Sequence, residues 1–303
     1  MLKKNRSFQK RKKTNSYPMR ILSISLVITA MIVLFSCGQE SQVSNSTSDS
    51  LTNEKKDYAS LVQCLASSTA LEDPDKCLKS HPELLESLTE TQTDSISYYL
   101  IEALNRVSNS LDISGDYELD VAKESKKLEP FGIAVNSEEG MPFYCINWNY
   151  VFSNMHKKAS PNMKAFLRYR DKYPEKLSYD AGLAFSPMEL SERTIEAEQL
   201  IANGDFLMRD YVLSELSDVT TYIFFGMDNT PSFEYETNEL YEESKTALEF
   251  LQKNGGPVVA GVVRDFLHHL EVNSWKRTDE MWELYNNEII RKKLEDKYPL
   301  GKQ

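Results

Sequence analysis

The stretch "SPMELSERTIEAEQLIANG", residues 186–204, decides the fold class of this chain. It opens with serine, then proline at the first helical position, and a glutamate three residues after the serine, which is the signature of a capping box. Asn203-Gly204 supplies a stop signal. Apolar or small residues recur every three or four positions, which is the period of one helix face. The stretch therefore predicts an amphipathic α-helix whose inward face is Leu190, Thr194, Ala197 and Ile201.

Three segments downstream repeat this pattern, and each is closed by glycine or opened by proline. A last helix is predicted to begin near Thr278. Because the turns between these segments are mostly short, neighbouring helices are expected to pack antiparallel. The predicted inward faces are Val212, Leu216, Val219 and Ile223; Leu240, Ser244, Ala247 and Leu251; Val259, Val263, Phe266 and Leu270; and Trp282, Tyr285 and Ile289.

Helix start signals also occur upstream, at Ser160-Pro161, Asp73-Pro74 and His81-Pro82. No motif repeats at a fixed period, so no named repeat class is indicated. The sequence predicts an all-α fold, an antiparallel helical array that is open to a solenoid-like arrangement.

One region departs from helical spacing, "FGIAVNSEEGMPFYCINWNYVF" at 131–152. Apolar and polar residues alternate there on both sides of Glu139-Gly140, which predicts a small β-hairpin or extended segment. We expect it to separate an N-terminal helical subdomain, 57–130, from a C-terminal part, 131–303, made of the hairpin segment and the helical array. The residues at period two are Tyr144, Ile146, Trp148, Tyr150 and Phe152.

The N-terminal region is typical of an export signal. Fifteen uncharged, mostly apolar residues run from Ile21 to Phe35, and eight Lys or Arg residues with no Asp or Glu precede them. The run is short for a bilayer-spanning helix, which needs about 20 residues. Basic residues before such a run stay on the cytoplasmic side, so the chain after it is expected to cross the membrane. Translation from Met1 or from Met19 gives the same result.

The sequence Leu34-Phe35-Ser36-Cys37 resembles the lipobox of bacterial lipoproteins, although Phe35 is bulkier than the usual residue. The resemblance implies that the signal peptide 1–36 is removed and that Cys37 carries lipid, including palmitate. Two or more acyl chains anchor a protein stably in a membrane. We therefore expect an extracytoplasmic lipoprotein on the outer membrane or on the outer face of the cytoplasmic membrane. The alternative is an uncut anchor in which Cys37 is only a small apolar residue.

The segment after the cysteine, 37–56, is rich in Ser, Asn and Thr and predicts a flexible linker. Removing the signal takes eight basic residues from 35 and none of the 46 acidic ones, which leaves a formal charge of −19. Such a charge disfavours nucleic acid, because its recognition needs clustered Lys and Arg. The expected membrane contact is the N-terminal lipid.

Three cysteines follow Cys37 in the chain. Cys64 and Cys77 flank Asp73-Pro74 on two short predicted helices, so a disulfide between them fits an oxidising compartment. Two buried thiols fit the same pattern. Cys145 lies among aromatic residues with no cationic neighbour, which indicates a structural cysteine rather than a nucleophile.

The sequence holds no strong catalytic or metal motif: HExxH, CxxC, GxSxG and Gly-rich phosphate loops are all missing. The adjacent pair His268-His269 cannot share one helix face. We therefore expect a protein that is not an enzyme and takes no cofactor or metal.

Two stretches remain as candidate binding sites. In "FFGMDNTPSFEYETNEL", 224–240, the candidates are Asp228, Asn229, Phe233 and Tyr235, and a rigid helix-capping loop is the structural alternative. In "FYCINWNY", 143–150, Tyr144 and Trp148 are candidates, and core aromatics are the alternative. Together with "EGMPFY" and "YDAGLAFS", the first stretch is similar to uncharacterised exported helical proteins of bacteria, which implies no particular activity.

Three functions of different classes fit these observations. An interaction or scaffold lipoprotein that contacts an envelope protein comes first, because helical arrays present extended surfaces. A binder of envelope glycans or peptides would bring the two aromatic stretches into one pocket. A hydrolase that uses Asp180, Asp228 or a glutamate would need two carboxylates about 5 to 10 Å apart in a cleft.

Overall fold

The computed structural model describes residues 47–111, 120–138, 141–173 and 177–299. Cys37, the signal peptide and most of the linker lie outside these residues. The described residues are mostly helical and their strands form three small two-stranded antiparallel sheets, which confirms the predicted all-α class. The described residues from Ser50 onward belong to one compact unit.

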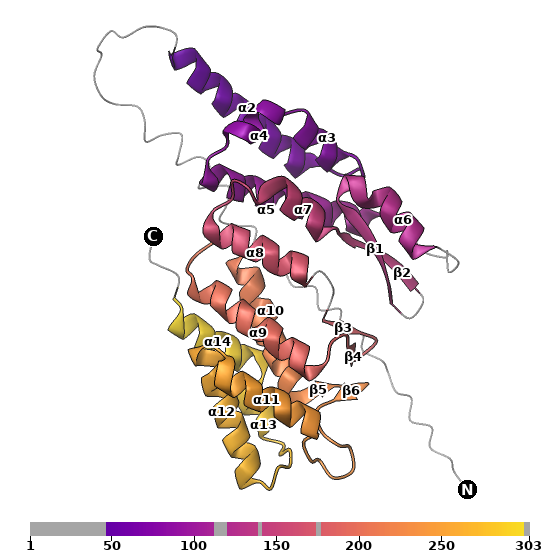
Figure 1. Ribbon diagram of the computed structural model, residues 1–303, viewed down its shortest axis with the longest axis vertical. Coiled ribbons are helices and arrows are strands. Elements are labelled where there is room, and N and C mark those ends of the chain that lie inside the picture. The colour runs from indigo at the N-terminus through magenta and orange to yellow at the C-terminus, as the bar shows by residue number, and fades with distance from the viewer. Residues whose placement is uncertain (1–46, 112–119, 139–140, 174–176, 300–303) are drawn as a thin grey trace, which may run out of the picture. The chain divides into compact units, whose positions relative to one another are not determined.

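The helices follow one another along the chain with few interruptions (Figure 1). The first group is α2 Thr47–Ser67, α3 Asp73–Lys79, α4 Pro82–Ser87, α5 Glu90–Ser110, α6 Val121–Leu128 with the 3₁₀ turn Glu129–Phe131, and α7 Trp148–Met155. The second group is α8 Pro161–Lys172, α9 Pro187–Ala202, α10 Arg209–Phe225, α11 Glu242–Asn254, α12 Pro257–Val272, α13 Met281–Tyr285 and α14 Asn287–Lys297.

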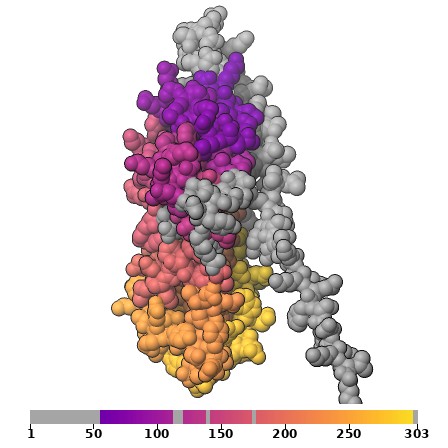
Figure 2. All heavy atoms as spheres, turned by 90° about the vertical axis from the view of Figure 1, so that its right-hand side faces the viewer, coloured from indigo at the N-terminus to yellow at the C-terminus, as the bar shows by residue number. Residues whose placement is uncertain are grey.

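Helices near in sequence are also neighbours in space. Helix α10 packs against α9, α11 and α14, while α11 packs against α9 and α12. In the space-filling view the colours of the described residues follow chain order, from indigo to yellow (Figure 2). The array therefore pairs consecutive helices, such as α9 with α10 and α11 with α12, and it also packs α11 on α9 and the last helix, α14, on α10.

The helix caps follow from the sequence. The hydroxyl of Ser186 accepts the backbone N–H of Glu189 at 3.3 Å, and the Glu189 carboxylate accepts the N–H of Ser186 at 2.9 Å, so the predicted capping box is present. Ser160 caps α8 by accepting the N–H of Met163 at 3.2 Å. Asp73 differs: it is the first residue of α3, and its carboxylate accepts the N–H groups of Thr69 and Ala70 in the preceding turn.

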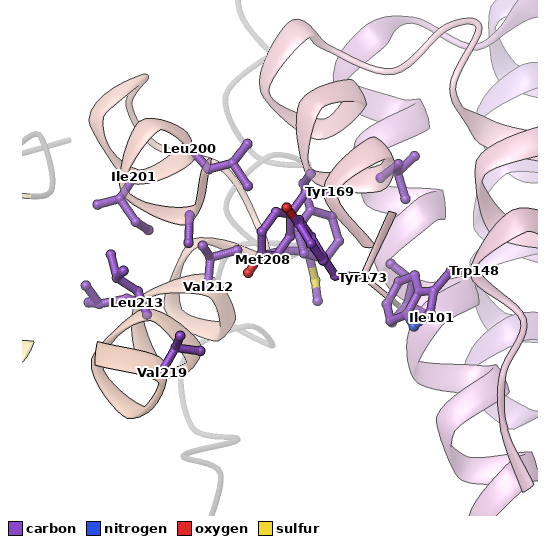
Figure 3. Packing of buried hydrophobic residues seen from close by; sticks show 14 of the residues in the cluster. Ile101, Trp148, Tyr169, Tyr173, Leu200, Ile201, Met208, Val212, Leu213 and Val219 are labelled. Carbon is purple, nitrogen blue, oxygen red and sulfur yellow. The ribbon is translucent and has the colours of Figure 1, made fainter. Parts of the chain in front are cut away.

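The predicted inward faces of α9, α10 and α12 form the core. All four residues of the α12 face have no exposed surface, and the ring of Phe266 stacks on Phe224 of α10 with centroids 4.2 Å apart. The core continues through α8, where Tyr169 and Tyr173 lie between α10 residues such as Val212 and the N-terminal helices (Figure 3).

The prediction for the last helix is wrong in register. The chain breaks at Asn286, whose extended backbone and side-chain amide cap α14 through the N–H of Ile289. Trp282 is therefore 48% exposed, while Tyr285 is buried as expected. The residues that face inward in place of Trp282 and Ile289 are Met281, Ile290 and Leu294.

The predicted hairpin is present but shorter than the alternation suggests. Strands β1, Ile133–Glu138, and β2, Met141–Ile146, pair from Ile133 opposite Ile146 to Glu138 opposite Met141. Asn147 then caps α7 by accepting the N–H of Tyr150, so residues 148, 150 and 152 lie on a helix and not on a strand. The hairpin packs on α5 and α6, and the subdomain boundary at residue 130 stays a prediction.

Two smaller hairpins connect longer helices. Strands β3, Ser178–Tyr179, and β4, Gly182–Leu183, precede α9, while β5, Gly226–Met227, and β6, Thr230–Pro231, follow α10. Gly226 has a φ of 70°, and a Cβ there would lie 2.4 Å from the backbone N of Ser232 and O of Thr230. Only glycine fits where α10 ends and the loop turns back.

Candidate functional site

The strongest candidate for a functional site is a surface made by two loop-rich segments, 232–241 and 272–285, which we call the aromatic loop surface. The backbone joins these segments. Leu240 N–H donates to the carbonyl of Trp275 at 3.1 Å, and Arg277 N–H donates to the carbonyl of Asn238 at 2.9 Å. Glu239 and Lys276 form an isolated antiparallel bridge between these two bonds. The segments therefore act as one support for the side chains they carry.

The backbone of this support is unusual. Asn238, Ser274 and Trp275 have φ angles of 56°, 58° and 63°. Left-handed conformations are uncommon outside glycine and especially for bulky residues, so local contacts must hold them. The N–H of Trp275 donates to the carbonyl of Leu270 at 2.6 Å, and the ammonium of Lys245 lies 4.2 Å from the Trp275 ring centroid.

A tight turn fixes the other segment. The carboxylate of Glu234 accepts the backbone N–H groups of Thr237 at 2.6 Å and Glu236 at 2.8 Å. Because these bonds favour the charged form, the pKa of Glu234 is held below its ordinary value, the N–H of Thr237 contributing most. The turn presents Tyr235 outward, and the hydroxyl of Tyr235 donates to the carbonyl of Asp228.

Exposed apolar side chains concentrate on this surface. Among the described residues, eight large hydrophobic side chains are exposed, and five of them lie in these two segments. The ring of Trp282 packs against that of Phe225, with ring centroids 5.1 Å apart. Clustered exposed apolar residues are typical of interaction sites, whereas single ones are ordinary. The five are Tyr235, Tyr241, Val272, Trp282 and Leu284.

The surface also carries six carboxylates against two cations. Both cations have partners: Lys276 lies 3.7 Å from Glu239 of the same surface, and the guanidinium of Arg277 lies 5.7 Å from the ring centroid of Phe225 at the end of α10. Glu280 contacts His269 at 3.4 Å. In the described part of the chain no ion pair involves Glu236, Asp279 or Glu283, which flank the exposed rings in sequence.

The four predicted residues of the 224–240 loop have different environments. Tyr235 is 68% exposed, and Asp228 and Asn229 are exposed as expected. Phe233 is buried at 4%, because its backbone bridges to Leu240 and its ring enters the core. Phe233 is therefore removed from the candidate binding residues.

The loop does not cap α11, because Tyr241 at the N-cap position makes no side-chain cap. Instead it contacts the β3–β4 turn. Asn229 N–H donates to the carbonyl of Ala181 at 2.9 Å, and its side-chain amide donates to the carbonyl of Asp180 at 2.5 Å. Asp180 and Asp228 are both exposed beside this contact, and neither lines the two hollows described below.

The second predicted stretch is mostly structural. Trp148 is 7% exposed and packs edge-on against Phe166, so it is core and not a ligand-facing ring. Tyr144 is half-buried against the core. Phe143 contacts the ring of Tyr179 at 6.4 Å between centroids. The two predicted aromatic stretches thus both contact the β3–β4 hairpin, and neither lines a described hollow.

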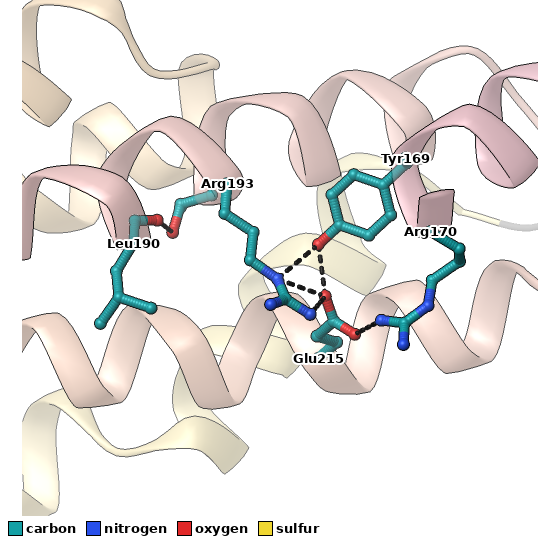
Figure 4. Close-up of polar contacts among 6 residues, drawn as sticks. Tyr169, Arg170, Leu190, Arg193 and Glu215 are labelled. Atoms are coloured by element: carbon teal, nitrogen blue, oxygen red, sulfur yellow. Dashed lines mark hydrogen bonds and ion pairs between the residues drawn. The ribbon is translucent and has the colours of Figure 1, made fainter. Parts of the chain in front are cut away.

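A buried charge cluster of Tyr169, Arg170, Arg193 and Glu215 was missed by the sequence reasoning (Figure 4). Glu215 of α10 accepts from Arg193 of α9 at 2.7 Å and from Arg170 of α8 at 2.9 Å. The Tyr169 hydroxyl also donates to Glu215. Arg193, at 1% exposure, is the largest fully buried side chain described.

Aromatic rings compensate the second guanidinium charge in this cluster. Arg170 lies 4.6 Å from the Trp148 centroid and 5.3 Å from that of Tyr211, while Arg193 lies 5.3 Å from Tyr173. Arg170 Nε and Arg193 Nη1 have no hydrogen-bond acceptor among described residues. Ring faces attract cations, so these contacts offset part of the cost. The cluster connects the three helices α8, α9 and α10 through buried ion pairs.

A signal for this cluster existed in the sequence. Arg193 stands three residues after Leu190, and Glu215 three residues after Val212, so each falls on the inward stripe of its helix. Burial raises the pKa of the Tyr169 hydroxyl well above its usual value, and the adjacent Glu215 charge raises it further. Tyr169 therefore stays protonated and donates to Glu215.

The disulfide alternative is the one that the structure contains. Cys64 of α2 and Cys77 of α3 are bonded, with Cα atoms 5.8 Å apart. Cys77 is 1% exposed, and the guanidinium of Arg106 donates to the carbonyl of Leu65 at 2.7 Å beside the bond. Together these contacts attach the end of α2 to α3 and α5. Cys145 places its thiol 3.7 Å from the carbonyl of Ala134 in the hairpin.

Two hollows lie along α11 and α12. The larger, about 580 Å³, is lined by Gln252, Lys253, Pro257, Ala260, Gly261 and Arg264. The second, about 360 Å³, reaches Trp275 at the edge of the aromatic loop surface. The described residues contain no group of three or more His, Cys, Asp or Glu side chains that could hold a metal ion.

No helix among the described residues combines the length and apolarity that crossing a membrane requires. Comparison with known proteins found no matching family model, no matching curated protein and no matching solved structure.

Proposed function

We propose that this chain is a membrane-anchored extracytoplasmic lipoprotein that binds a partner protein through its aromatic loop surface. The observation that carries the proposal is the gathering of Trp282, Tyr235 and three other exposed apolar side chains on two segments joined by backbone hydrogen bonds. Tyrosine and tryptophan dominate binding energy at protein interfaces. A rigid support lowers the entropy cost of association, because the rings are already held in place.

The sequence supports the anchored location. The signal-like N-terminus, the lipobox-like Cys37 and the polar linker together describe a domain held near a membrane by lipid. The Cys64–Cys77 disulfide agrees with an oxidising compartment. The expected arrangement is a helical domain whose partner is a protein of the same envelope.

Site-specific cross-linking in intact cells tests the binding surface. A photoreactive phenylalanine analogue replaces Leu284, which is 47% exposed, in the full chain. We expect a discrete cross-linked adduct that disappears when Trp282→Ala and Tyr235→Ala are combined with it. The matched control carries the analogue at Leu207, which is 54% exposed outside the surface and should give no such adduct. An adduct that survives the double substitution would contradict the proposed surface.

Metabolic labelling tests the anchor separately. Labelled palmitate should enter the wild-type chain and not the Cys37→Ser variant, which should accumulate as an unprocessed precursor. Label retained in Cys37→Ser would show that Cys37 is not the lipid attachment site.

A further inference from the structure

The aromatic loop surface combines exposed rings with carboxylates, and this chain shows elsewhere what that combination binds. The ammonium of Lys172 lies 2.5 Å from the carboxylate of Glu196 and 4.9 Å from the Tyr173 ring centroid. The same combination recurs in the buried cluster, where Arg193 contacts Glu215 and the ring of Tyr173. In both places a cation is held between a carboxylate and a ring face.

The exposed surface presents rings and carboxylates, and three of the carboxylates have no ion-pair partner among the described residues. Glu236 follows Tyr235 in the chain, and Asp279 and Glu283 stand three residues before and one residue after Trp282. These three carboxylates are exposed and enter no ion pair in the described part of the chain. The cations nearby are engaged, Arg277 on Phe225 and Lys276 on Glu239.

Resting on the proposed function, we infer that the partner presents Lys or Arg side chains interspersed with apolar ones to this surface. The cations would stack on Trp282 and Tyr235 and pair with carboxylates of the same two segments, among them Asp279, three residues before Trp282. Guanidinium and ammonium groups bind ring faces, most strongly those of tryptophan, and charge pairing supplies specificity and a faster encounter. A mature chain of charge −19 would attract such a partner over longer distances.

Synthetic peptides test this chemistry on the intact protein. The probe is a 15-residue peptide in which Arg alternates with Leu and Ser, and the matched probes replace every Arg by Glu or by Gln. Affinity is measured by titration calorimetry at two salt concentrations. We expect binding of the Arg peptide alone, weakened by salt because exposed charge pairs are screened.

Two matched double variants assign the contact to the surface. Asp279→Asn with Glu283→Gln should weaken binding of the Arg peptide about tenfold, because two carboxylates that pair with its guanidinium groups are removed. A tenfold change corresponds to about 1.4 kcal/mol. The control, Glu83→Gln with Glu86→Gln, removes two exposed carboxylates of α4 and should change affinity less than twofold. Equal losses in the two variants would show general attraction to an acidic protein and would overturn the inference.

The inference and the proposed function fail in different experiments. If the Leu284 adduct depends on Trp282 and Tyr235 but the Gln peptide binds as well as the Arg peptide, the surface is a binding site for apolar rather than cationic partners. If the adduct does not depend on those rings, the proposed binding surface is contradicted, whatever affinities the peptides show.

Discussion

The buried charge cluster and the aromatic loop surface are built from the same chemical groups at opposite exposures. In the cluster, two guanidinium groups share one carboxylate and contact several rings, with less than a tenth of each charged side chain exposed. On the surface, two rings are about half exposed or more, and three carboxylates form no ion pair with any residue that the structure describes.

This difference separates stability from binding. Charged groups and rings that pair inside the protein hold helices together and are not accessible to a ligand. Exposed rings and carboxylates with no cation among the described residues remain able to bind one. Buried charges are costly when a partner is removed, whereas exposed charges are screened by water. The two regions should therefore respond oppositely to substitution, and the following experiments test that contrast in order of expected effect.

The largest effect is expected for Glu215→Gln, which leaves two buried guanidinium groups without their carboxylate. Removing one partner of a buried ion pair typically costs about 3 to 5 kcal/mol of unfolding free energy. The matched control is Glu295→Gln, because Glu295 pairs with Arg291 at 2.8 Å with both side chains at least 36% exposed. That substitution should cost about 0.5 kcal/mol or less. Urea unfolding of both variants decides, and similar losses would remove the contrast.

The Cys64–Cys77 disulfide contributes stability without involving charge, so its loss of unfolding free energy can be compared with that of the buried charge cluster. Replacing Cys64 and Cys77 by Ala opens a link across 13 residues. We expect a loss of about 3 kcal/mol, because a loop of this length is released in the unfolded chain. Cys145→Ala is the control with no cross-link to lose. If the double variant unfolds like the wild type, the bond does not secure α2.

A second buried carboxylate extends the contrast to pH. Glu198 is 1% exposed and accepts the N–H of Val258 at 2.9 Å and the hydroxyl of Tyr298 at 3.0 Å. Burial raises its pKa above 4.5, more than these hydrogen bonds lower it. Gly256 makes room for it, since a Cβ there would lie 2.4 Å from the Glu198 carboxyl carbon.

The sign of the pH effect follows from that raised pKa. Between the unfolded value near 4.5 and the higher folded value, the folded state binds more protons, so the stability that Glu198 contributes falls as pH rises. The stability difference between wild type and Glu198→Gln should therefore shrink from pH 4.5 toward neutrality. Urea titrations of both proteins at several pH values measure it. A difference that grows with pH would mean that the pKa of Glu198 is lowered by folding.

The regular part of the fold could be predicted because its signals are local. The capping box at Ser186 and the four-residue stripe of α12 act within one helix, and the structure contains both. The period-two spacing of Trp148, Tyr150 and Phe152 predicts a strand. The same spacing also occurs in a short helix, where residues 148 and 152, four positions apart, share one face. Asn147 decides between them by capping α7.

The candidate sites depended on contacts between distant segments. Phe233 and Trp148 are aromatic residues beside turn residues, a pattern that predicts exposed rings, yet both side chains lie in the hydrophobic core. The sequence does not predict the second half of the aromatic loop surface. A single helix from Thr278 places Trp282 inward, whereas in the structure the helix ends before Asn286, which caps α14. Only the pairing of 238–240 with 275–277 brings Tyr235 and Trp282 onto one support.

A small stability change is expected at the aromatic loop surface, which gives the most direct test of the central claim. In Trp282→Ala with Tyr235→Ala, unfolding free energy and cross-linking from position 284 are measured on the same full-length protein. The account predicts a loss of unfolding free energy clearly smaller than that of Glu215→Gln, because Trp282 is 48% and Tyr235 68% exposed, together with complete loss of the adduct. A loss as large as that of Glu215→Gln, or an adduct that persists, would contradict it and make these rings part of the fold's support.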